Sequence, residues 1–133
     1  MLSDHPSREE IEAVFRNDRF ATDAAGCRVE EGSKGHAVCS MKLADVHRNA
    51  MHNVMGGAIF TLADFALAIA CNLGEKPTVS VESSISFLSA TKGTELIATA
   101  TCDKSGRNLG FYTILVEDDL GKQIARMTAT CYR

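Results

Sequence analysis

The chain has 133 residues, of which 45% are hydrophobic and 23% charged, and its net charge is -3 at pH 7. This length and composition are typical of one globular domain, which we expect to span residues 1–133. The small negative charge offers no electrostatic reason for binding nucleic acid or an anionic membrane, so we expect neither partner.

The first part of the chain predicts one short helix followed by two strands. Ser7-Arg8-Glu9-Glu10 fits a capping box, and the apolar residues after it recur on one helical face, which predicts a helix over 8–17. Two strands are expected over 26–43, around the turn-rich stretch 31–35. In the second strand, apolar and polar residues alternate, and the apolar face consists of Ala37, Cys39, Met41 and Leu43.

A long helix and four more strands are predicted after a loop over 44–55. The segment from Gly57 to Leu73 is rich in Ala, Leu and Ile, and Gly74 ends it. Because it is apolar on nearly every side, we expect other structure to surround it. After Pro77 the apolar residues recur with a period of two, and turn residues divide the rest into strands over 79–87, 96–102, 109–116 and 122–132.

The order of these elements indicates an α+β fold. Consecutive strands joined by short turns pair in antiparallel fashion, so we expect one antiparallel sheet. One long apolar helix with one sheet to cover it predicts that the sheet curls around the helix. This is the hotdog arrangement, with a short N-terminal helix in addition. Such a single layer leaves a sheet edge and one face uncovered, which predicts a homodimer or a homotetramer.

Other sequence features bear on location and on metal sites. The first ten residues, MLSDHPSREE, show no basic segment followed by an apolar one, so we expect no secretory leader and a cytoplasmic location. The longest apolar stretch, 58–71, is too short to cross a bilayer and contains Asp64. The five cysteines form no C-x-x-C pair and the histidines are not spaced against them as ligands, which predicts reduced thiols and no metal site.

The start of the long helix is a candidate site. Gly56-Gly57 alone is a weak signal, because adjacent glycines often only let a loop turn into a helix. A helix N-terminus nevertheless presents N–H groups without intrahelical partners, and its dipole favours negative charge, as an oxyanion hole requires. Asp64 stands among apolar residues, where an unpaired carboxylate acquires a raised pKa or requires donors. Such acids are candidates for catalysis, although structural networks also produce them.

The spacing of these two features argues that one chain does not complete the site. Asp64 follows Gly57 by seven residues, which is about 10 Å along a helix axis. Both groups are therefore unable to contact one carbonyl held at the N-terminus of their own helix. A partner chain with an antiparallel helix would supply the acid, so the sequence predicts a composite active site at a dimer interface.

These residues resemble a known family. The pattern N-x5-H-G-G-x4-L-x-D is typical of hotdog thioesterases similar to PaaI, named for phenylacetic acid degradation, and residues 49–64 run NAMHNVMGGAIFTLAD. The positions that keep the family spacing are Asn49, Gly56, Gly57, Leu62 and Asp64. The resemblance covers most of the chain, including V-S-V at 79–81, F-L at 87–88 and G-R at 106–107.

The resemblance implies hydrolysis of acyl-CoA thioesters without a cofactor, since coenzyme A is part of the substrate. It implies that Asp64 is the general base for water or the nucleophile, and that the Gly56 N–H polarises the thioester carbonyl. Asn49 would orient the water or the carbonyl, and Ser80 would position the same water. An oxyanion donor contributes on the order of 10²–10³ in rate, and a placed base roughly 10²–10⁴.

The chain departs from the family pattern at two places. Met55 stands where the family has the His of H-G-G, which leaves catalysis and mere substrate binding both open. After F-L, the family's basic residue and Pro are replaced by Ser89-Ala90-Thr91-Lys92. Other basic residues would then meet the phosphates of coenzyme A, because Lys and Arg suit phosphate groups. The expected substrate-binding set is Gly57, Met55, Lys92, Lys104 and Arg107.

The sequence is compatible with two other functions. A non-catalytic acyl-CoA or acyl-carrier binding protein on the same fold is favoured by Met55, and it would bind a CoA thioester without releasing thiol. A dehydratase acting on hydroxyacyl thioesters usually needs a His paired with an acid, and the loop offers no His at the matching position. The dehydratase therefore ranks last, and the acyl group, aromatic or aliphatic, is left open.

Overall fold

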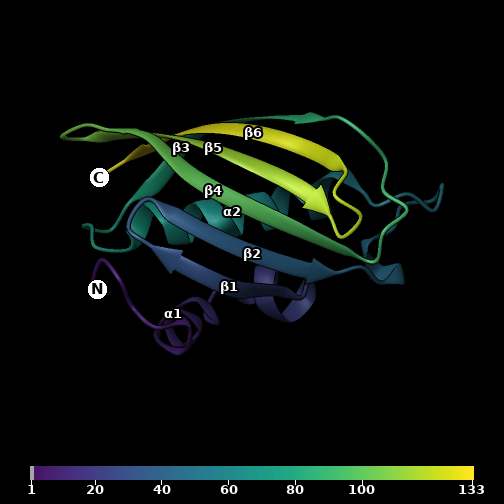
Figure 1. Ribbon diagram of the computed structural model, residues 1–133, viewed down its shortest axis with the longest axis horizontal. Coiled ribbons are helices and arrows are strands. Elements are labelled where there is room, and N and C mark those ends of the chain that lie inside the picture. The colour runs from purple at the N-terminus through teal and green to yellow at the C-terminus, as the bar shows by residue number, and fades with distance from the viewer. Residues whose placement is uncertain (1) are drawn as a thin grey trace.

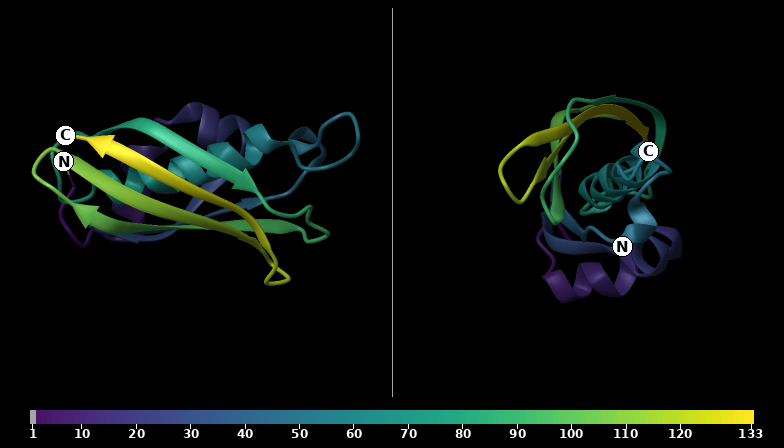
Figure 2. Two further views of the ribbon diagram at one scale, coloured as in Figure 1. Left: turned by 90° about the horizontal axis from the view of Figure 1, so that it is seen from above. Right: turned by 90° about the vertical axis from the view of Figure 1, so that its right-hand side faces the viewer.

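A computed structural model describes residues 2–133 and shows an antiparallel sheet curled around one long helix (Figure 1). The strand order is β1-β2-β4-β5-β6-β3. Seen along the long helix, the sheet wraps around it on several sides (Figure 2), which confirms the predicted α+β hotdog arrangement. The elements are α1 (Arg8–Phe15), η1 (Phe20–Ala24), β1 (Cys27–Ser33), β2 (His36–Lys42), η2 (Asp45–His47), α2 (Gly56–Asn72), β3 (Val79–Phe87), β4 (Glu95–Ser105), β5 (Leu109–Asp118) and β6 (Gln123–Tyr132).

The N-terminal helix α1 forms as the capping box predicts. The Ser7 Oγ accepts a hydrogen bond from the Glu10 N–H at 3.2 Å, and Glu10 Oε1 accepts one from the Ser7 N–H at 3.0 Å. Ile11 and Phe15 are its buried residues, and the Phe15 ring packs edge-on against Phe65 of α2. The helix ends two residues before the predicted boundary at residue 17, and the π-helical turn η1 follows, which the sequence did not predict.

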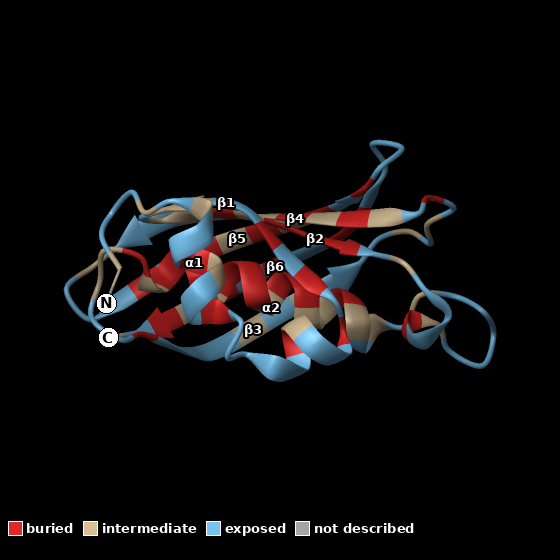
Figure 3. Cartoon of the chain, turned by 90° about the horizontal axis from the view of Figure 1, so that it is seen from below, coloured by how far each residue is buried: buried red, intermediate tan, exposed pale blue. Residues whose placement is uncertain are grey.

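The core lies between α2 and the inner face of the sheet (Figure 3). Strands β2, β4 and β5 cross the helix and contribute fully buried residues such as Met41, Leu96 and Ile114. One row of α2 is covered less well than the others, and its members are only half-buried: Thr61, Asp64, Ala68 and Asn72. Because residues three and four apart share a helix face, this row marks one side that the sheet leaves open.

Strand β3 is an edge strand with an irregular register. Ser80 lies opposite Cys131, but Glu82 lies opposite Thr130, so Val81 is an extra residue that forms a β-bulge. Directly opposed residues share a face of the sheet, and Cys131 is fully buried, so Ser80 faces α2. An unbroken period of two from Ile85 would have turned Ser80 outward. The bulge therefore brings this serine to the helix side.

The structure also bears on the predictions for the cysteines and for membrane-spanning segments. All five cysteines are free thiols, and four of them are buried, as predicted. Within residues 2–133, no helix is both long enough and apolar enough to cross a membrane.

Candidate active site

Asp64 lies on the third turn of α2 beside a small cavity. The cavity has a volume of about 80 Å³ and is lined by Asp64, Leu67, Ala68, Cys71, Thr78 and Ser80. Burial raises the pKa of the Asp64 carboxyl above its ordinary value of 3.8, and the negative charge of Asp18 raises the pKa further. Among residues 2–133, no cation or hydrogen bond offsets these two effects. The site therefore contains a partly dehydrated acid that binds a proton more readily than an exposed one.

The start of β3 is fixed against the end of α2, and this fixes the cavity. The Asn72 carboxamide accepts a hydrogen bond from the Thr78 N–H at 2.8 Å and donates one to the Thr78 carbonyl at 3.2 Å. The bulge at Val81, three residues after Thr78, turns Ser80 toward the cavity. The structure thus brings together two predicted residues, Asp64 and Ser80, and adds the buried Thr78, which no sequence pattern indicated.

Gly56 is the first residue of α2, and its N–H points out of the helix end. Met55 precedes the helix in an extended conformation, and its carbonyl accepts hydrogen bonds from the N–H groups of Ala58 and Ile59. Within residues 2–133, the N–H groups of Gly56 and Gly57 have no protein acceptor. A Cβ at Gly56 would lie 2.9 Å from Cζ of Phe87, so glycine permits the close approach of this ring. The helix therefore begins with two free donors, as an anion site requires.

The predicted Asn49 side chain builds the loop before α2. Its Oδ1 accepts hydrogen bonds from the Met51 N–H at 2.9 Å and the Asn53 N–H at 3.1 Å. The Asn49 N–H donates to the Asn53 carbonyl at 2.8 Å. The carboxamide oxygen is thereby occupied, and the Nδ2 donors are the part of this side chain that remains for a ligand.

A second residue of this loop region, His47, was not singled out by the sequence. It is buried, its Nδ1 accepts from the Ala44 N–H at 3.0 Å, and its Nε2 lies 2.6 Å from the Ala25 carbonyl. Its own carbonyl accepts from the Met55 N–H at 2.9 Å. His47 therefore ties the entry of α2 to the segment before β1, and only its position in the folded chain reveals this role.

The structure separates the acid from the helix donors of the same chain. Asp64 follows Gly56 by eight residues, which is about 12 Å along the axis of α2. The two groups also border different cavities, since Gly56 lines a groove with Phe87, Leu88 and other residues of the β3 end. One chain thus holds both halves of the predicted site but does not bring them to one substrate atom.

The three predicted basic residues are exposed and lie at different ends of the molecule. Lys92 is in the connection from β3 to β4, close to the groove that Gly56 borders with Ser89 and Ala90. Lys104 and Arg107 lie at the β4–β5 hairpin, at the opposite end of the sheet in Figure 1. Within one chain, Lys92 alone of the three lies near the start of α2.

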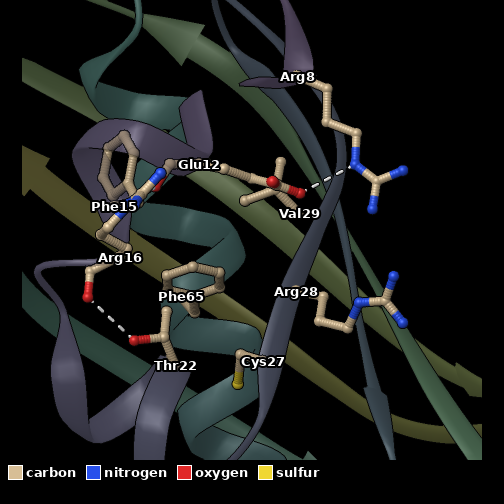
Figure 4. Close-up of a pocket in the computed structure, with 9 residues that line it drawn as sticks. All are labelled: Arg8, Glu12, Phe15, Arg16, Thr22, Cys27, Arg28, Val29 and Phe65. Atoms are coloured by element: carbon tan, nitrogen blue, oxygen red, sulfur yellow. Dashed lines mark hydrogen bonds and ion pairs between the residues drawn. The ribbon is translucent and has the colours of Figure 1, made fainter. Parts of the chain in front are cut away.

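A larger pocket of about 440 Å³ lies between α1, η1 and β1, away from the predicted residues (Figure 4). Its floor includes Phe15 and Phe65, and arginine side chains stand at its sides. Its one thiol belongs to Cys27, and burial raises the pKa of this thiol to about 12. A thiol with so high a pKa stays protonated near neutral pH and is a poor nucleophile, so this pocket lacks the chemistry that the Asp64 cavity offers.

Comparisons with known proteins identify the family. The family model of the Thioesterase superfamily matches residues 51–125. Human acyl-coenzyme A thioesterase 13 is 31% identical over 123 residues, which are 90% of this chain and 88% of that protein. The Escherichia coli acyl-coenzyme A thioesterase PaaI is 30% identical over 130 residues, or 97% and 92% of the two chains.

Solved structures agree with the sequence matches. The structure of E. coli PaaI superposes with a TM-score of 0.87 at 26% identity, covering 95% of this chain and 92% of that one. A Streptococcus mutans protein bound to acetyl-CoA superposes with a TM-score of 0.74 at 26% identity, covering 78% and 85% of the chains. On the fold, the helix motif and these matches together, the chain belongs to the thioesterase superfamily as a PaaI-like hotdog thioester hydrolase.

Proposed function

We propose that the protein hydrolyses acyl-CoA thioesters to a free acid and CoA, at a site that two protomers share. The observation that carries this proposal is the partly buried Asp64 carboxylate, which borders a cavity about 12 Å along α2 from two free N–H donors. The human and E. coli relatives bear the name of acyl-CoA thioesterases, and the S. mutans neighbour binds acetyl-CoA, which supports this substrate class.

In the proposed reaction the Gly56 N–H donates a hydrogen bond to the thioester oxygen, and the Asp64 carboxylate of the other protomer takes a proton from water. The water oxygen attacks the carbonyl carbon, the C–S bond breaks, and the CoA sulfur leaves with that proton. A raised pKa suits a general base that works near neutral pH. Ser80, in the Asp64 cavity, would hold the water, and Asn49 Nδ2 would orient the carbonyl. No cofactor takes part.

Asp64 is also suited to attack the carbonyl carbon itself, in which case the C–S bond breaks, CoA leaves as the thiolate, and water then hydrolyses the mixed anhydride by attacking the Asp64 carbonyl carbon. A single turnover in ¹⁸O-labelled water separates the two routes. A general base puts the heavy oxygen into the product acid, whereas a nucleophile places it in Asp64 after the first turnover. Mass spectrometry of the acid and of the Asp64 peptide provides both measurements.

The proposed homodimer or homotetramer is supported by the surfaces that one chain leaves open. The outer edge of β3 pairs with no other strand among residues 2–133, and Val79 and Val81 are exposed on it. The half-buried row of α2 that contains Asp64 lies next to this strand, since Ser80 and Asp64 border one cavity. A second copy placed along β3 would cover the strand edge and the Asp64 row together.

The activity is tested by thiol release from a panel of CoA thioesters with aromatic and aliphatic acyl groups. We expect release by the native protein and none above background by Asp64→Ala. Binding of a thioester without thiol release would contradict hydrolysis and favour a binding protein, and an enoyl product from a hydroxyacyl-CoA would favour a dehydratase. Hydrolysis by Asp64→Ala at the native rate would rule out the proposed role of the acid.

The shared site is tested by mixing two inactive variants. Asp64→Asn lacks the base, and Gly56→Pro lacks the N–H donor at the helix start. After unfolding and refolding together in equal amounts, random pairing makes half of the dimers mixed, and each mixed dimer has one intact site, so we expect roughly a quarter of the native activity. If both groups came from the same chain, mixing would restore nothing.

Met55 and the basic residues complete the proposed substrate contacts. Met55 stands beside Gly57, whose nearest neighbour for an added Cβ is the Met55 methyl at 3.7 Å. Lys92 is the basic residue that we propose for a CoA phosphate, because it lies at the end of the sheet where α2 begins. Lys104 and Arg107 stay candidates that would contact substrate only from the partner's side. Lys92→Ala should raise KM for acyl-CoA while leaving kcat unchanged.

A further inference from the structure

A groove on the other side of the α2 start has no role in the chemistry described above. It lies between η1, η2 and the first turns of α2 and has a volume of about 400 Å³. This volume falls within the range of pockets that bind small organic ligands. Its lining residues are Phe20, Ala24, Ala25, Val46, His47, Met55, Gly57, Ala58 and Thr61.

Large apolar side chains stand exposed around this groove. Phe20 and Val46 are each 73% exposed, and Met55 is 46% exposed. Single exposed apolar residues are common on protein surfaces, but three around one concavity mark a surface that binds an apolar partner or ligand. They come from three neighbouring segments, namely η1, η2 and the residue before α2, and all three line this groove.

The polar side chains of the groove are already satisfied within the chain. Thr61 Oγ1 donates a hydrogen bond to the Gly57 carbonyl at 2.8 Å. The two ring nitrogens of His47 are engaged by the Ala44 N–H and the Ala25 carbonyl. A ligand carboxylate would lose its water here and find no free side-chain donor, which costs binding free energy.

We propose that this groove holds the acyl group of the substrate and selects an uncharged, apolar acyl group over one that carries a carboxylate. The inference rests on the proposed function, because Gly57 lines the groove and adjoins Gly56, whose N–H would hold the thioester oxygen. The acyl chain starts at that same carbonyl carbon, and the groove is the apolar space beside it. Met55 adds a flexible thioether to this lining, which fits itself to acyl groups of different shapes.

The inference is tested by binding of S-alkyl-CoA thioethers, which the enzyme does not hydrolyse. We expect Kd, measured by calorimetry, to fall from S-ethyl-CoA to S-hexyl-CoA by about fourfold per methylene, the factor that corresponds to about 0.8 kcal/mol. A thioether of the same length that ends in a carboxylate should bind no more tightly than S-ethyl-CoA. This comparison separates apolar contact from general affinity for CoA.

Two variants locate the effect in the groove. Phe20→Ala and Val46→Ser should each reduce the decrease in Kd to about twofold per methylene. Both variants should leave the Kd of S-ethyl-CoA unchanged, because only the longer chains reach these side chains. Leu120→Ala is the matched control, since Leu120 is 70% exposed in the β5–β6 turn and lies outside the groove. The control should keep the native gain per methylene.

Three results would overturn the inference. The first is a Kd that does not depend on chain length, and the second is a Phe20→Ala variant that behaves like Leu120→Ala. The third is conversion of the Phe20 or Val46 variants to monomers in light scattering, which would make the groove an interface between copies. Chain-length dependence without thiol release from acyl-CoA would refute only the proposed hydrolysis, whereas thiol release without chain-length dependence would refute only the groove.

Discussion

Replacing Gly56 by proline should remove one N–H donor from the start of α2 and leave the helix intact. Gly56 is the first helical residue, and its N–H has no acceptor within residues 2–133. Proline is favoured at this position, because the missing N–H makes no intrahelical bond and the fixed φ suits the helix. Met55, with φ -72° and ψ 146°, already has the extended conformation that a residue before proline requires.

The matched control for this variant is Gly56→Ala. Any Cβ at this position lies 2.9 Å from Cζ of Phe87, so both variants push the ring away. The Phe87 side chain is 53% exposed, and it has room to turn toward solvent. Alanine keeps the N–H and proline does not, so the ratio of the two activities isolates the donor.

Loss of one oxyanion donor typically reduces kcat by about 10²–10³, which corresponds to about 2.7–4 kcal/mol. We therefore expect kcat of Gly56→Pro to be lower than that of Gly56→Ala by this factor in a thiol-release assay. Urea unfolding should place the two variants within about 1 kcal/mol of each other, since the fold loses no hydrogen bond. A proline variant whose kcat stays within roughly threefold of the alanine variant would show that the Gly56 N–H does not stabilise the oxyanion.

Three further substitutions test other groups. Asp64→Asn should lower kcat by at least about 10² and raise the free energy of unfolding at pH 7. Because the folded-state pKa of Asp64 is raised, this gain in the free energy of unfolding should be absent below pH 3.8, the ordinary pKa of the group, and should grow as the pH rises above that value. Urea unfolding measured from pH 3 to 8 checks this dependence. Gly57→Ala should stabilise the protein by roughly 0.5–1 kcal/mol in urea, since the new Cβ meets only the Met55 methyl at 3.7 Å. Asn49→Asp keeps the accepting oxygen and removes the amide donors, so kcat/KM should fall while the urea midpoint stays unchanged, and an unchanged kcat/KM would exclude the donor role.

The regular elements were largely predictable, because local patterns determine them. The capping box at Ser7 located α1, and the two glycines and Gly74 located α2 to within one residue at each end. Alternating apolar residues and turn sequences located the strands. The π-helical turn η1 was missed, because one turn of such a helix has no periodicity of its own and arises where the chain is packed against its neighbours.

The candidate site was predictable only in part. The sequence indicated Asp64 and the donors at Gly56, since an acid in an apolar helix and a pair of glycines can be recognised from the residue order alone. The family resemblance placed Ser80 beside the same water as Asp64, but the alternation of β3 alone did not, because the bulge at Val81 depends on pairing with β6, about fifty residues later in the chain. The role of Thr78 depends in the same way on Asn72, whose side chain bonds to its backbone.

One chain covers α2 incompletely, and this explains the position of Asp64. The sheet surrounds most of the helix, and Asp64 belongs to the one row that it leaves half-buried, next to the unpaired edge of β3. A two-fold partner placed along that edge contacts equivalent residues in both directions, so a single interface would create two sites at once. A monomer then has the base and the donors but no complete site. Activity per chain should therefore fall on dilution below the dimer Kd and return when the protein is concentrated.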